Sequence, residues 1–221
     1  MKLSDRTVTI LKNFSLINQS LCFKKGSVLS TISTGKSILG IAKIAEKFPQ
    51  DFAIYDLSRF LGVHSLFETP DIQFEKGWLT IAAENHSVKY IYASPDMIDK
   101  PKEGAISVDK FEIEFSLPER NLSALMKAAA LMQLPEVAVV GDGKKMFIAS
   151  LNTENPTGDE YVVEVGKSIS NKFRMVFDVE NLKLLSDEYK VQISSKGIGC
   201  FTSKDLTYWV PCKQKASEFK E

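Results

Sequence analysis

Few residues of this chain stand in an arrangement that could carry out chemistry. The run Thr34-Gly35-Lys36-Ser37 ends like a phosphate-binding loop, but that motif requires a glycine five residues before Gly35, where Ser30 stands. The pattern that follows is not that of a long helix either. We therefore expect a hairpin turn at this run, and an enzyme that binds a nucleotide there is the weaker hypothesis.

The residue types that serve as nucleophiles, bases or metal ligands are scattered. His64 and Cys212 have no partner at catalytic spacing, so we expect both to be packing residues. The three cysteines, Cys22, Cys200 and Cys212, lack the close spacing of a zinc site, and their odd number argues against a disulfide framework. These observations predict a reducing compartment and a protein with no cofactor, no metal and no enzymatic activity.

The composition bounds the size and charge of the fold. A chain of 221 residues with 44% hydrophobic content can form one large domain or two smaller ones. The 28 basic and 28 acidic residues cancel, which argues against nucleic-acid binding through bulk charge but leaves room for a local basic patch. No apolar run approaches the ~18 residues of a membrane span, and the first residues do not resemble a signal peptide. We therefore expect a soluble, cytoplasmic protein without a membrane partner.

Basic side chains recur on the outer faces of predicted helices. The first helix, Leu3–Asn18, has Ser4 as its N-cap and Arg6 on its outer face, with Lys12 at the flank of that face. Its inner face is an apolar stripe at helical spacing, formed by Val8, Ile10, Leu11, Phe14 and Ile17. Thr9 and Asn13 are expected on the outer face beside Arg6.

A second helix of the same kind is predicted over Leu117–Met132, where Arg120 falls as Arg6 does in the first. Its predicted buried stripe consists of Leu122, Leu125, Met126, Ala129 and Met132, and Arg120 and Lys127 share the opposite stripe. Two short helices, each after a strand that ends in an aspartate, carry Arg59 and Lys183. Such faces suit phosphate contacts without sequence reading, although basic residues on a helix exterior are usually only solvated.

The chain also reads as a duplication. Both halves contain a long helix, several strands, a strand that ends in Asp56 or Asp178, a short helix and a meander. Between them, a stretch rich in charge and proline predicts an interdomain connector. We therefore expect a first domain over 1–93, a connector over 94–108 and a second domain over 109–221. The polar tail, Lys213–Glu221, is expected to fray.

A duplicated unit of this kind predicts an α+β fold in which antiparallel sheet lies on one side and helices cover the other. The sheet edges at the two ends of the chain must be covered or paired. Head-to-tail contact with further copies that closes on itself would give a ring. We expect the paired edges near Val88–Tyr92 and Tyr161–Val165.

Two blocks of sequence carry a resemblance to a known family. The stretch from Met1-Lys2-Leu3-Ser4 to Ile17-Asn18 and the stretch from Phe52-Ala53-Ile54-Tyr55-Asp56-Leu57 to Phe60-Leu61-Gly62 are similar to the sliding clamps, the DNA polymerase processivity factors, of T-even-like bacteriophages. Chain length, two-domain layout and connector fit the family over the whole chain.

The resemblance implies two similar DNA-clamp domains per chain and a homotrimeric ring, with helices inside and sheets outside. Such a ring encircles duplex DNA without reading its sequence, tethers the polymerase and is loaded by an ATP-dependent clamp loader. In these phages it also engages late-transcription factors, in the cytoplasm of the infected bacterium. Carried over by position, the DNA-facing residues are Arg6, Lys12, Arg59, Arg120, Lys127 and Lys183.

The resemblance also implies an apolar partner pocket beside the connector, bordered by the end of the chain. The residues at those positions are Met97, Ile98, Tyr208, Val210 and Pro211. The alternative for Tyr208 and Val210 is that they form the inward face of a strand. An alternative for the whole protein is a non-enzymatic phage interaction or assembly module with the same fold.

Overall fold

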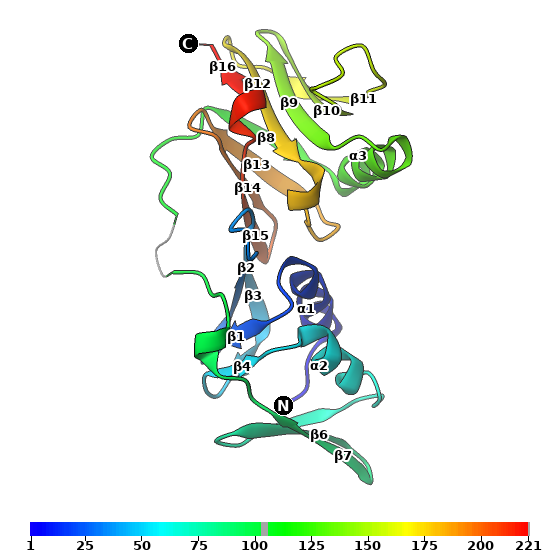
Figure 1. Cartoon of the computed structure of the whole chain (residues 1–221), viewed down its shortest axis with the longest axis vertical. Helices are drawn as coiled ribbons and strands as arrows, with labels where there is room; N and C mark the ends of the chain where they lie inside the picture. Colours follow the sequence, from blue (N-terminus) through cyan, green and yellow to red (C-terminus); the bar gives the residue numbers. More distant parts are fainter. Residues whose placement is uncertain (103–105, 221) are drawn as a thin grey trace. The chain divides into compact units, whose positions relative to one another are not determined.

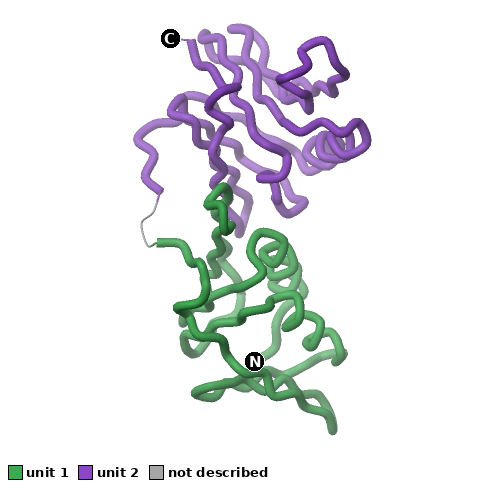
Figure 2. The backbone as a smooth tube through the Cα atoms, in the orientation of Figure 1, with its two compact units in different colours: residues 1–105 green, residues 106–221 purple. Residues whose placement is uncertain are grey.

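A computed structural model describes residues 1–102 and 106–220 of the chain. The chain divides into two compact units, Met1–Ala105 and Ile106–Glu221 (Figure 2). This division falls within the stretch 94–108 predicted as connector, and the boundaries at 93 and 109 stay predictions. Glu103 and Gly104 of the connector and Glu221 of the tail lie outside the described residues.

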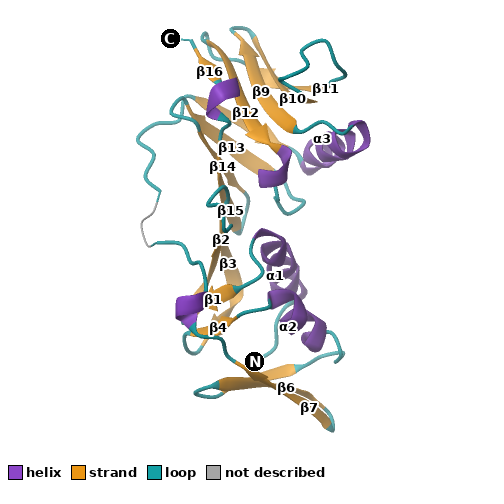
Figure 3. Cartoon of the chain, in the orientation of Figure 1, coloured by secondary structure: helices purple, strands orange, loops and turns teal. Residues whose placement is uncertain are grey.

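Unit 1 combines short antiparallel strands with two α-helices in its described residues (Figures 1 and 3). The helices are α1 (Asp5–Ile17) and α2 (Leu57–His64), and a 3-10 turn, η1 (Pro95–Met97), follows the last strand. The strands are β1 (Leu21–Phe23), β2 (Gly26–Ile32), β3 (Leu39–Phe48), β4 (Phe52–Ile54), β5 (Asp71–Phe74), β6 (Trp78–Ala83) and β7 (His86–Ile91). Strand β1 pairs with β4, β2 with β3, and β5, β6 and β7 form a meander in that order.

A cluster of phenylalanines joins the sheets of unit 1. Phe23 of β1 and Phe52 of β4 are register partners, and their rings stack with centroids 4.4 Å apart. Phe48, at the end of β3, meets both rings edge-on. All three side chains are buried, so the aromatic contacts hold β1, β3 and β4 in one core.

Unit 2 has one α-helix and nine strands in its described residues. Helix α3 (Glu119–Met132) packs against β10 and β11, and the 3-10 turns are η2 (Val179–Asn181) and η3 (Gln214–Ala216). The strands are β8 (Ile113–Leu117), β9 (Glu136–Asp142), β10 (Lys145–Leu151), β11 (Tyr161–Lys167), β12 (Lys172–Asp178), β13 (Tyr189–Ser194), β14 (Ile198–Thr202), β15 (Leu206–Pro211) and β16 (Glu218–Phe219). One sheet has the order β11-β10-β9-β12-β16, and within the unit a second runs β15-β14-β13-β8.

The two sheets of unit 2 pack face to face through aromatic rings. Phe177 of β12 meets Phe201 of β14 edge-on, with ring centroids 5.7 Å apart. A Cβ atom on Gly199 would lie 2.8 Å from the Phe177 ring, so only glycine allows this close approach of strand and ring. Tyr189 and Tyr208 are fully buried in the same core.

The duplication is visible as matching topology. The order α1-β1-β2-β3-β4-α2-β5-β6-β7 recurs as α3-β9-β10-β11-β12-η2-β13-β14-β15. The pairings recur as well: β1 with β4 and β9 with β12, β2 with β3 and β10 with β11, and each final meander. Even the entry strand has a counterpart, because Met1 exchanges two backbone hydrogen bonds of 2.8 Å with Ile72 of β5, as β8 pairs with β13. The predicted pair of similar α+β domains is therefore confirmed.

The short helix predicted after Asp178 forms only as the 3-10 turn η2, and the predicted aspartate cap is wrong. Asp56 caps α2 by accepting a hydrogen bond from the Arg59 backbone N–H at 2.8 Å. The side chain of Asp178 makes no cap hydrogen bond, and its carboxylate lies 3.8 Å from Lys213 Nζ instead. Only the three-residue turn η2 forms, and Lys183 follows it in a loop.

The predicted frayed tail is also wrong over its described residues. Glu136 at the start of β9 is fully buried and accepts hydrogen bonds from Lys213 Nζ and from the Thr153 backbone N–H. Ser217 Oγ accepts from the Val176 N–H at 2.9 Å, and β16 adds to the edge of β12. The tail is thus held by an ion pair between a buried carboxylate and a partly exposed lysine, which pattern analysis of a polar terminus does not reveal.

The inner face of α1 also differs in detail from the prediction. Ile10, Leu11, Phe14 and Ile17 are buried as expected, but Val8 is only half-buried, whereas Thr7 and Asn13 are buried. Thr7 replaces an apolar contact with a hydrogen bond, because its hydroxyl donates to Glu46 Oε2 at 2.5 Å. In α3, Leu122, Leu125 and Ala129 are buried, while Met132 is exposed.

Strand β11 carries an irregularity near its end. Phe147 of β10 pairs with Glu164 and Met146 pairs with Gly166, so Val165 has no register partner and forms a β-bulge. The uninterrupted pairing with β10 therefore covers Tyr161 to Glu164, and it resumes at Gly166 beyond the bulge.

The substitution Glu136→Gln tests the tail anchor. Burial alone raises the pKa of Glu136, but the hydrogen bonds from Lys213 and Thr153 outweigh it and lower the pKa below its ordinary value. We expect Glu136→Gln to reduce the free energy of unfolding at pH 7 by about 2 kcal/mol, because the partly buried ion pair loses its negative charge. Urea denaturation measures the change.

The stability that Glu136 contributes depends on pH. A carboxyl whose pKa is lowered by folding contributes stability above its unfolded pKa and loses it as pH falls through the folded value. The Glu136→Gln variant should lose less stability than the original chain on acidification. The matched variant Glu114→Gln removes an exposed pair with Lys190 and should change little. Equal effects of the two variants would contradict the anchor.

Candidate functional site

Helix α1 presents basic side chains on the face that its core residues leave outward. Ser4 is the N-cap, as predicted, and its hydroxyl accepts from the Thr7 N–H. Arg6 and Lys12 are exposed. Glu46 of β3 fixes the start of the helix, because it accepts from the Ser4 N–H as well as from Thr7. The sheet therefore sets where the outer face of α1 points.

Helix α2 lies against α1 and adds Arg59 to the exposed basic side chains of unit 1 (Figure 1). Leu57, Phe60 and Leu61 are buried beneath it. Tyr90 of β7 contacts Phe60 edge-on and donates its hydroxyl to the Asp56 carbonyl at 3.2 Å. Asp56 is thus fixed by two hydrogen bonds. Its side chain accepts from the Arg59 N–H of α2, and its carbonyl accepts from the Tyr90 hydroxyl of β7.

His64, in the last turn of α2, lies close enough to Lys12 of α1 to sense its charge. Burial and then the positive charge of Lys12 lower the pKa of His64. A neutral imidazole at physiological pH follows, so His64 adds no charge to this face.

Helix α3 carries Arg120 and Lys127, both exposed, above its buried Leu122 and Leu125. The two cations are seven residues apart and so lie on one stripe, two turns from each other. Lys183 is exposed as well, but in the loop after η2. The structure thus groups Arg6, Lys12 and Arg59 on the adjoining helices of unit 1, and puts Lys127 and Arg120 on the one helix of unit 2. Their part in DNA contact stays a prediction.

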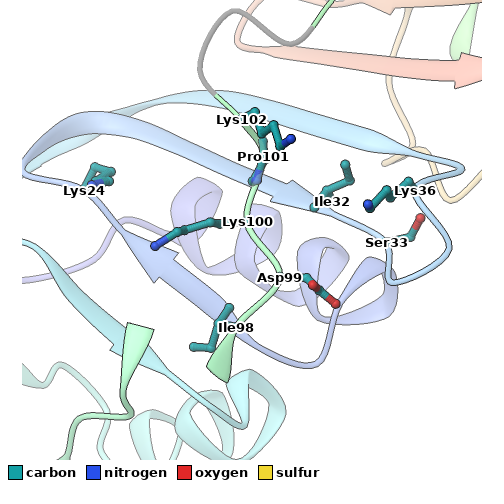
Figure 4. Close-up of a pocket in the computed structure, with 9 residues that line it drawn as sticks. All are labelled: Lys24, Ile32, Ser33, Lys36, Ile98, Asp99, Lys100, Pro101 and Lys102. Carbon is teal, nitrogen blue, oxygen red and sulfur yellow. The ribbon is translucent and has the colours of Figure 1, made fainter. Parts of the chain in front are cut away.

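A pocket of about 860 Å³ lies between the connector and the β2–β3 hairpin of unit 1 (Figure 4). Its apolar surface comes from Ile32, Ile98 and Pro101, and the volume falls in the range of pockets that bind small molecules or short peptide segments. The polar lining residues are Lys24, Ser33, Lys36, Asp99, Lys100 and Lys102. The pocket therefore offers an apolar floor inside a predominantly positive rim.

Asn18, the C-cap of α1, holds the two walls of this pocket together. Its Nδ2 donates to the carbonyl of Ile32 at 2.8 Å and to that of Asp99 at 3.5 Å. Its Oδ1 accepts from the N–H and the hydroxyl of Ser20. The side chain is buried, so one amide links the end of α1, the hairpin and the connector.

The sequence-predicted pocket residues fall in both units. Ile98 is buried and lines the pocket, whereas Met97 is 71% exposed in η1 and is not among the lining residues. Tyr208 and Val210 of β15 are fully buried on the inward face of their strand, and Pro211 is exposed at its end. A role of the unit 2 residues in a partner pocket stays a prediction.

Of the pocket residues that sequence reasoning missed, Lys36 lies in the run predicted as a hairpin turn, and Ile32 and Ser33 directly precede that run. That turn is confirmed, since Ser33 Oγ accepts from the N–H groups of Ser37 and Ile38, and Lys36 adopts a positive φ of 55°. Ser33 and Lys36 line the pocket only because the connector crosses the hairpin. The sequence feature that comes nearest to indicating this pocket is the high density of charged residues in the connector. Cys212 is buried with its pKa raised to about 12, so its thiol is a packing group.

Comparison with known proteins assigns the fold. A structure described as the C-terminal region of FEN-1 bound to A. fulgidus PCNA aligns with a TM-score of 0.73, at 11% identity over 96% of this chain and 98% of that one. The Helicobacter pylori beta clamp bound to DNA ligase peptide aligns with a TM-score of 0.67 at 14% identity, over 96% of this chain and 65% of that one. The duplicated α+β units thus have the fold of a DNA clamp.

Sequence relatives narrow the class. The family model described as DNA polymerase processivity factor matches residues 2–100, and that described as gp45 sliding clamp, C terminal, matches residues 114–214. The sliding clamp of Vibrio phage KVP40 is 25% identical over 95% of this chain and 98% of its own length, and that of Enterobacteria phage T4 is 27% identical over 89% of each. The chain belongs to the phage sliding clamp family of DNA polymerase processivity factors, which are not enzymes. Among the described residues, no helix is long and apolar enough to cross a membrane.

The substitution Asp56→Ala tests the cap that positions Arg59. Loss of the carboxylate leaves the Arg59 N–H without its acceptor, and we expect a loss of about 1 kcal/mol in the free energy of unfolding. Asp56→Asn keeps an acceptor oxygen and should stay near the original stability. Chemical denaturation of the three proteins measures both values. An Asn variant as unstable as the Ala variant would show that the cap hydrogen bond is not the stabilising contact.

Proposed function

We propose that three copies of this chain close into a ring that encircles duplex DNA and tethers the replicative polymerase. The observation that carries the proposal is the duplicated topology with an edge strand in each unit. Within the described residues, β7 ends the meander of unit 1 and β11 ends the larger sheet of unit 2, each with one side unpaired. Both lie where the sequence predicts paired edges.

In a closed ring, the unpaired edges of β7 and β11 would pair with edges of neighbouring copies. An unpaired strand edge is a template for association, and natural proteins cover such edges. Contact between β7 of one copy and β11 of the next is heterologous, so repetition closes into a ring if the rotation fits. Two exposed apolar side chains, Ile91 of β7 and Val162 of β11, support this contact, with exposed fractions of 61% and 46%.

In this ring the exposed basic residues of the helices neutralise DNA phosphates. Arg6, Lys12 and Arg59 act from unit 1, and Arg120, Lys127 and Lys183 from unit 2. Phosphate contacts carry no sequence information and exchange readily, so they suit a protein that must slide.

Retention on DNA tests the ring together with its charges. A loaded ring should stay on closed circular DNA and be lost when the DNA is linearised, because only topology holds it. Arg120→Glu with Lys127→Glu should lower loading about tenfold at moderate salt, because each phosphate contact adds to the salt-dependent affinity. Gel filtration of the protein–DNA mixtures measures both.

The control keeps the change in charge but moves it off the helices. Lys190→Glu with Lys196→Glu alters two exposed lysines of unit 2 outside α3 and should leave loading unchanged. Equal retention on circular and linear DNA would overturn the ring, and equal loss in both charge variants would overturn the helix contacts.

We further propose that the pocket under the connector receives an apolar segment of a partner. The related clamp structures named above hold partner pieces, the FEN-1 C-terminal region in one and a DNA ligase peptide in the other. Here Ile32, Ile98 and Pro101 would contact the apolar side chains. Met97, which is exposed in η1 beside this pocket, would extend its border. A part of Tyr208, Val210 and Pro211 of unit 2 in partner binding stays a separate prediction.

The substitution Ile32→Asp tests the pocket. A carboxylate on its floor would remove apolar contact and leave a desolvated charge, so we expect binding to the cognate polymerase to weaken at least about tenfold. Val28→Asp alters an exposed residue of the same strand that does not line the pocket, and should bind normally. Surface-immobilised clamp measures both affinities. Equal binding by the two variants would contradict the assignment.

The same pocket is the proposed attachment point for the ATP-dependent clamp loader and for late-transcription factors. One pocket for several partners makes their binding mutually exclusive on each copy. The proposed place of action is the cytoplasm of the infected bacterium, where phage DNA is replicated.

A further inference from the structure

We propose a specific register for the contact between copies, in which β7 of one copy runs antiparallel to β11 of the next and Lys89 lies opposite Glu164. The same register places Ile91 opposite Val162 and Tyr90 opposite Val163. This inference rests on the proposed ring and adds the residues that select the partner, which is a second copy of this chain.

The two edges share a face pattern that limits the register. In β7, Tyr90 is the register partner of buried Leu79 and contacts Phe60 of α2, so its side chain lies on the helix side of the sheet. Lys89 and Ile91 lie on the opposite side, where Lys89 Nζ lies 3.8 Å from the Trp78 ring centroid.

Strand β11 has the same two faces. Val163 is the partner of buried Ile148, on the face where Ser150 of β10 donates its hydroxyl to the Leu125 carbonyl of α3. Val162 and Glu164 lie on the opposite face. A shared sheet must keep the helix sides together, because a slip by one residue exposes every buried side chain. Tyr90 must therefore share a face with Val163, and Lys89 with Glu164.

Charge and apolar contact select one of the remaining registers. With Lys89 opposite Glu164, an exposed cation faces an exposed anion, and Ile91 covers Val162 two residues away. Glu164 already binds Lys145 Nζ at 2.8 Å on its own copy, so it would bridge two lysines. Directly opposite pairs of this kind are the main source of side-chain stabilisation between strands.

The neighbouring registers lose these contacts. A slip of two residues one way sets Lys89 against Val162, and the other way sets Ile91 against Glu164. A parallel arrangement can keep Lys89 beside Glu164 but sets Ser87 against Val162. Ile91 would then lie beyond the bulge at Val165, at the level of Gly166, which offers it no side chain to contact.

Disulfide trapping in the full chain tests the register. Opposite residues in an antiparallel pair have Cα atoms about 4.5–5.5 Å apart, which suits a disulfide, whereas a slip of two residues gives about 7–8 Å. The double variant Ile91→Cys/Val162→Cys should give covalent dimers and trimers under mild oxidation. Lys89→Cys/Val162→Cys and Ser87→Cys/Val162→Cys report the shifted and the parallel arrangements and should give few.

Two controls complete the experiment. The unsubstituted chain keeps its three native cysteines and should give no cross-link. Each single variant, Ile91→Cys or Val162→Cys, should also stay uncross-linked, because a head-to-tail contact brings no two equivalent residues together. Light scattering of the reduced proteins reports whether each variant assembles.

The outcomes separate the register from the ring. Cross-linking of the 91/162 pair well above the other pairs supports the register. Assembly without it, or with stronger cross-linking of another pair, overturns the register and leaves the ring standing. If neither the original chain nor any variant assembles, both proposals fail.

Exchange of the two charges tests the ion pair itself. Lys89→Glu and Glu164→Lys should each raise the concentration needed for assembly about tenfold or more, since each ring repeats the repulsion at every contact. The double variant should recover a large part of this loss. A double variant as weak as the two single changes combined would overturn the pairing of Lys89 with Glu164.

Discussion

The side-chain amide of Asn18 is the contact on which the arrangement of unit 1 depends. It ends α1, accepts hydrogen bonds from Ser20 and donates to carbonyls of β2 and of the connector. Because the amide is buried, each lost hydrogen bond would leave a polar group unsatisfied. The helix with basic side chains and the pocket under the connector are therefore linked through one buried side chain.

The duplication preserved strand pairing more strictly than helices. All four strands that precede α2 have paired counterparts before η2. The aspartates at the ends of the matching strands differ, because Asp56 caps α2, whereas its counterpart Asp178 lies near Lys213 and caps no helix. A sheet depends on backbone pairing along its length, whereas a short helix depends on one cap and a few side chains. In unit 2 a three-residue turn can therefore replace the short helix of unit 1 while the sheet is kept.

The sequence was informative where local chemistry decides. Ser4 and Asp56 were identifiable as caps because a side-chain oxygen before an amphipathic run serves the first turn, and the Gly141-Asp142-Gly143 hairpin formed as expected. Prediction from the sequence failed where contacts between residues far apart in the chain determine the structure. Glu136 fixes the tail from the start of β9, and Glu46 draws Thr7 into the core. The pocket was only half predictable, because Ile98 lies in the connector but Ile32 and Lys36 join it through a crossing that no spacing shows.

The bulge at Val165 has a consequence for how the proposed ring behaves in time. The bulge interrupts β11 after the four residues from Tyr161 to Glu164, so a single contact between copies along that stretch is short and weak on its own. The last contact of a closed ring is different, because its two edges are already tethered and meet at high effective concentration. One seam can then part and reseal while the other two hold, which would let a closed molecule admit a DNA without free ends.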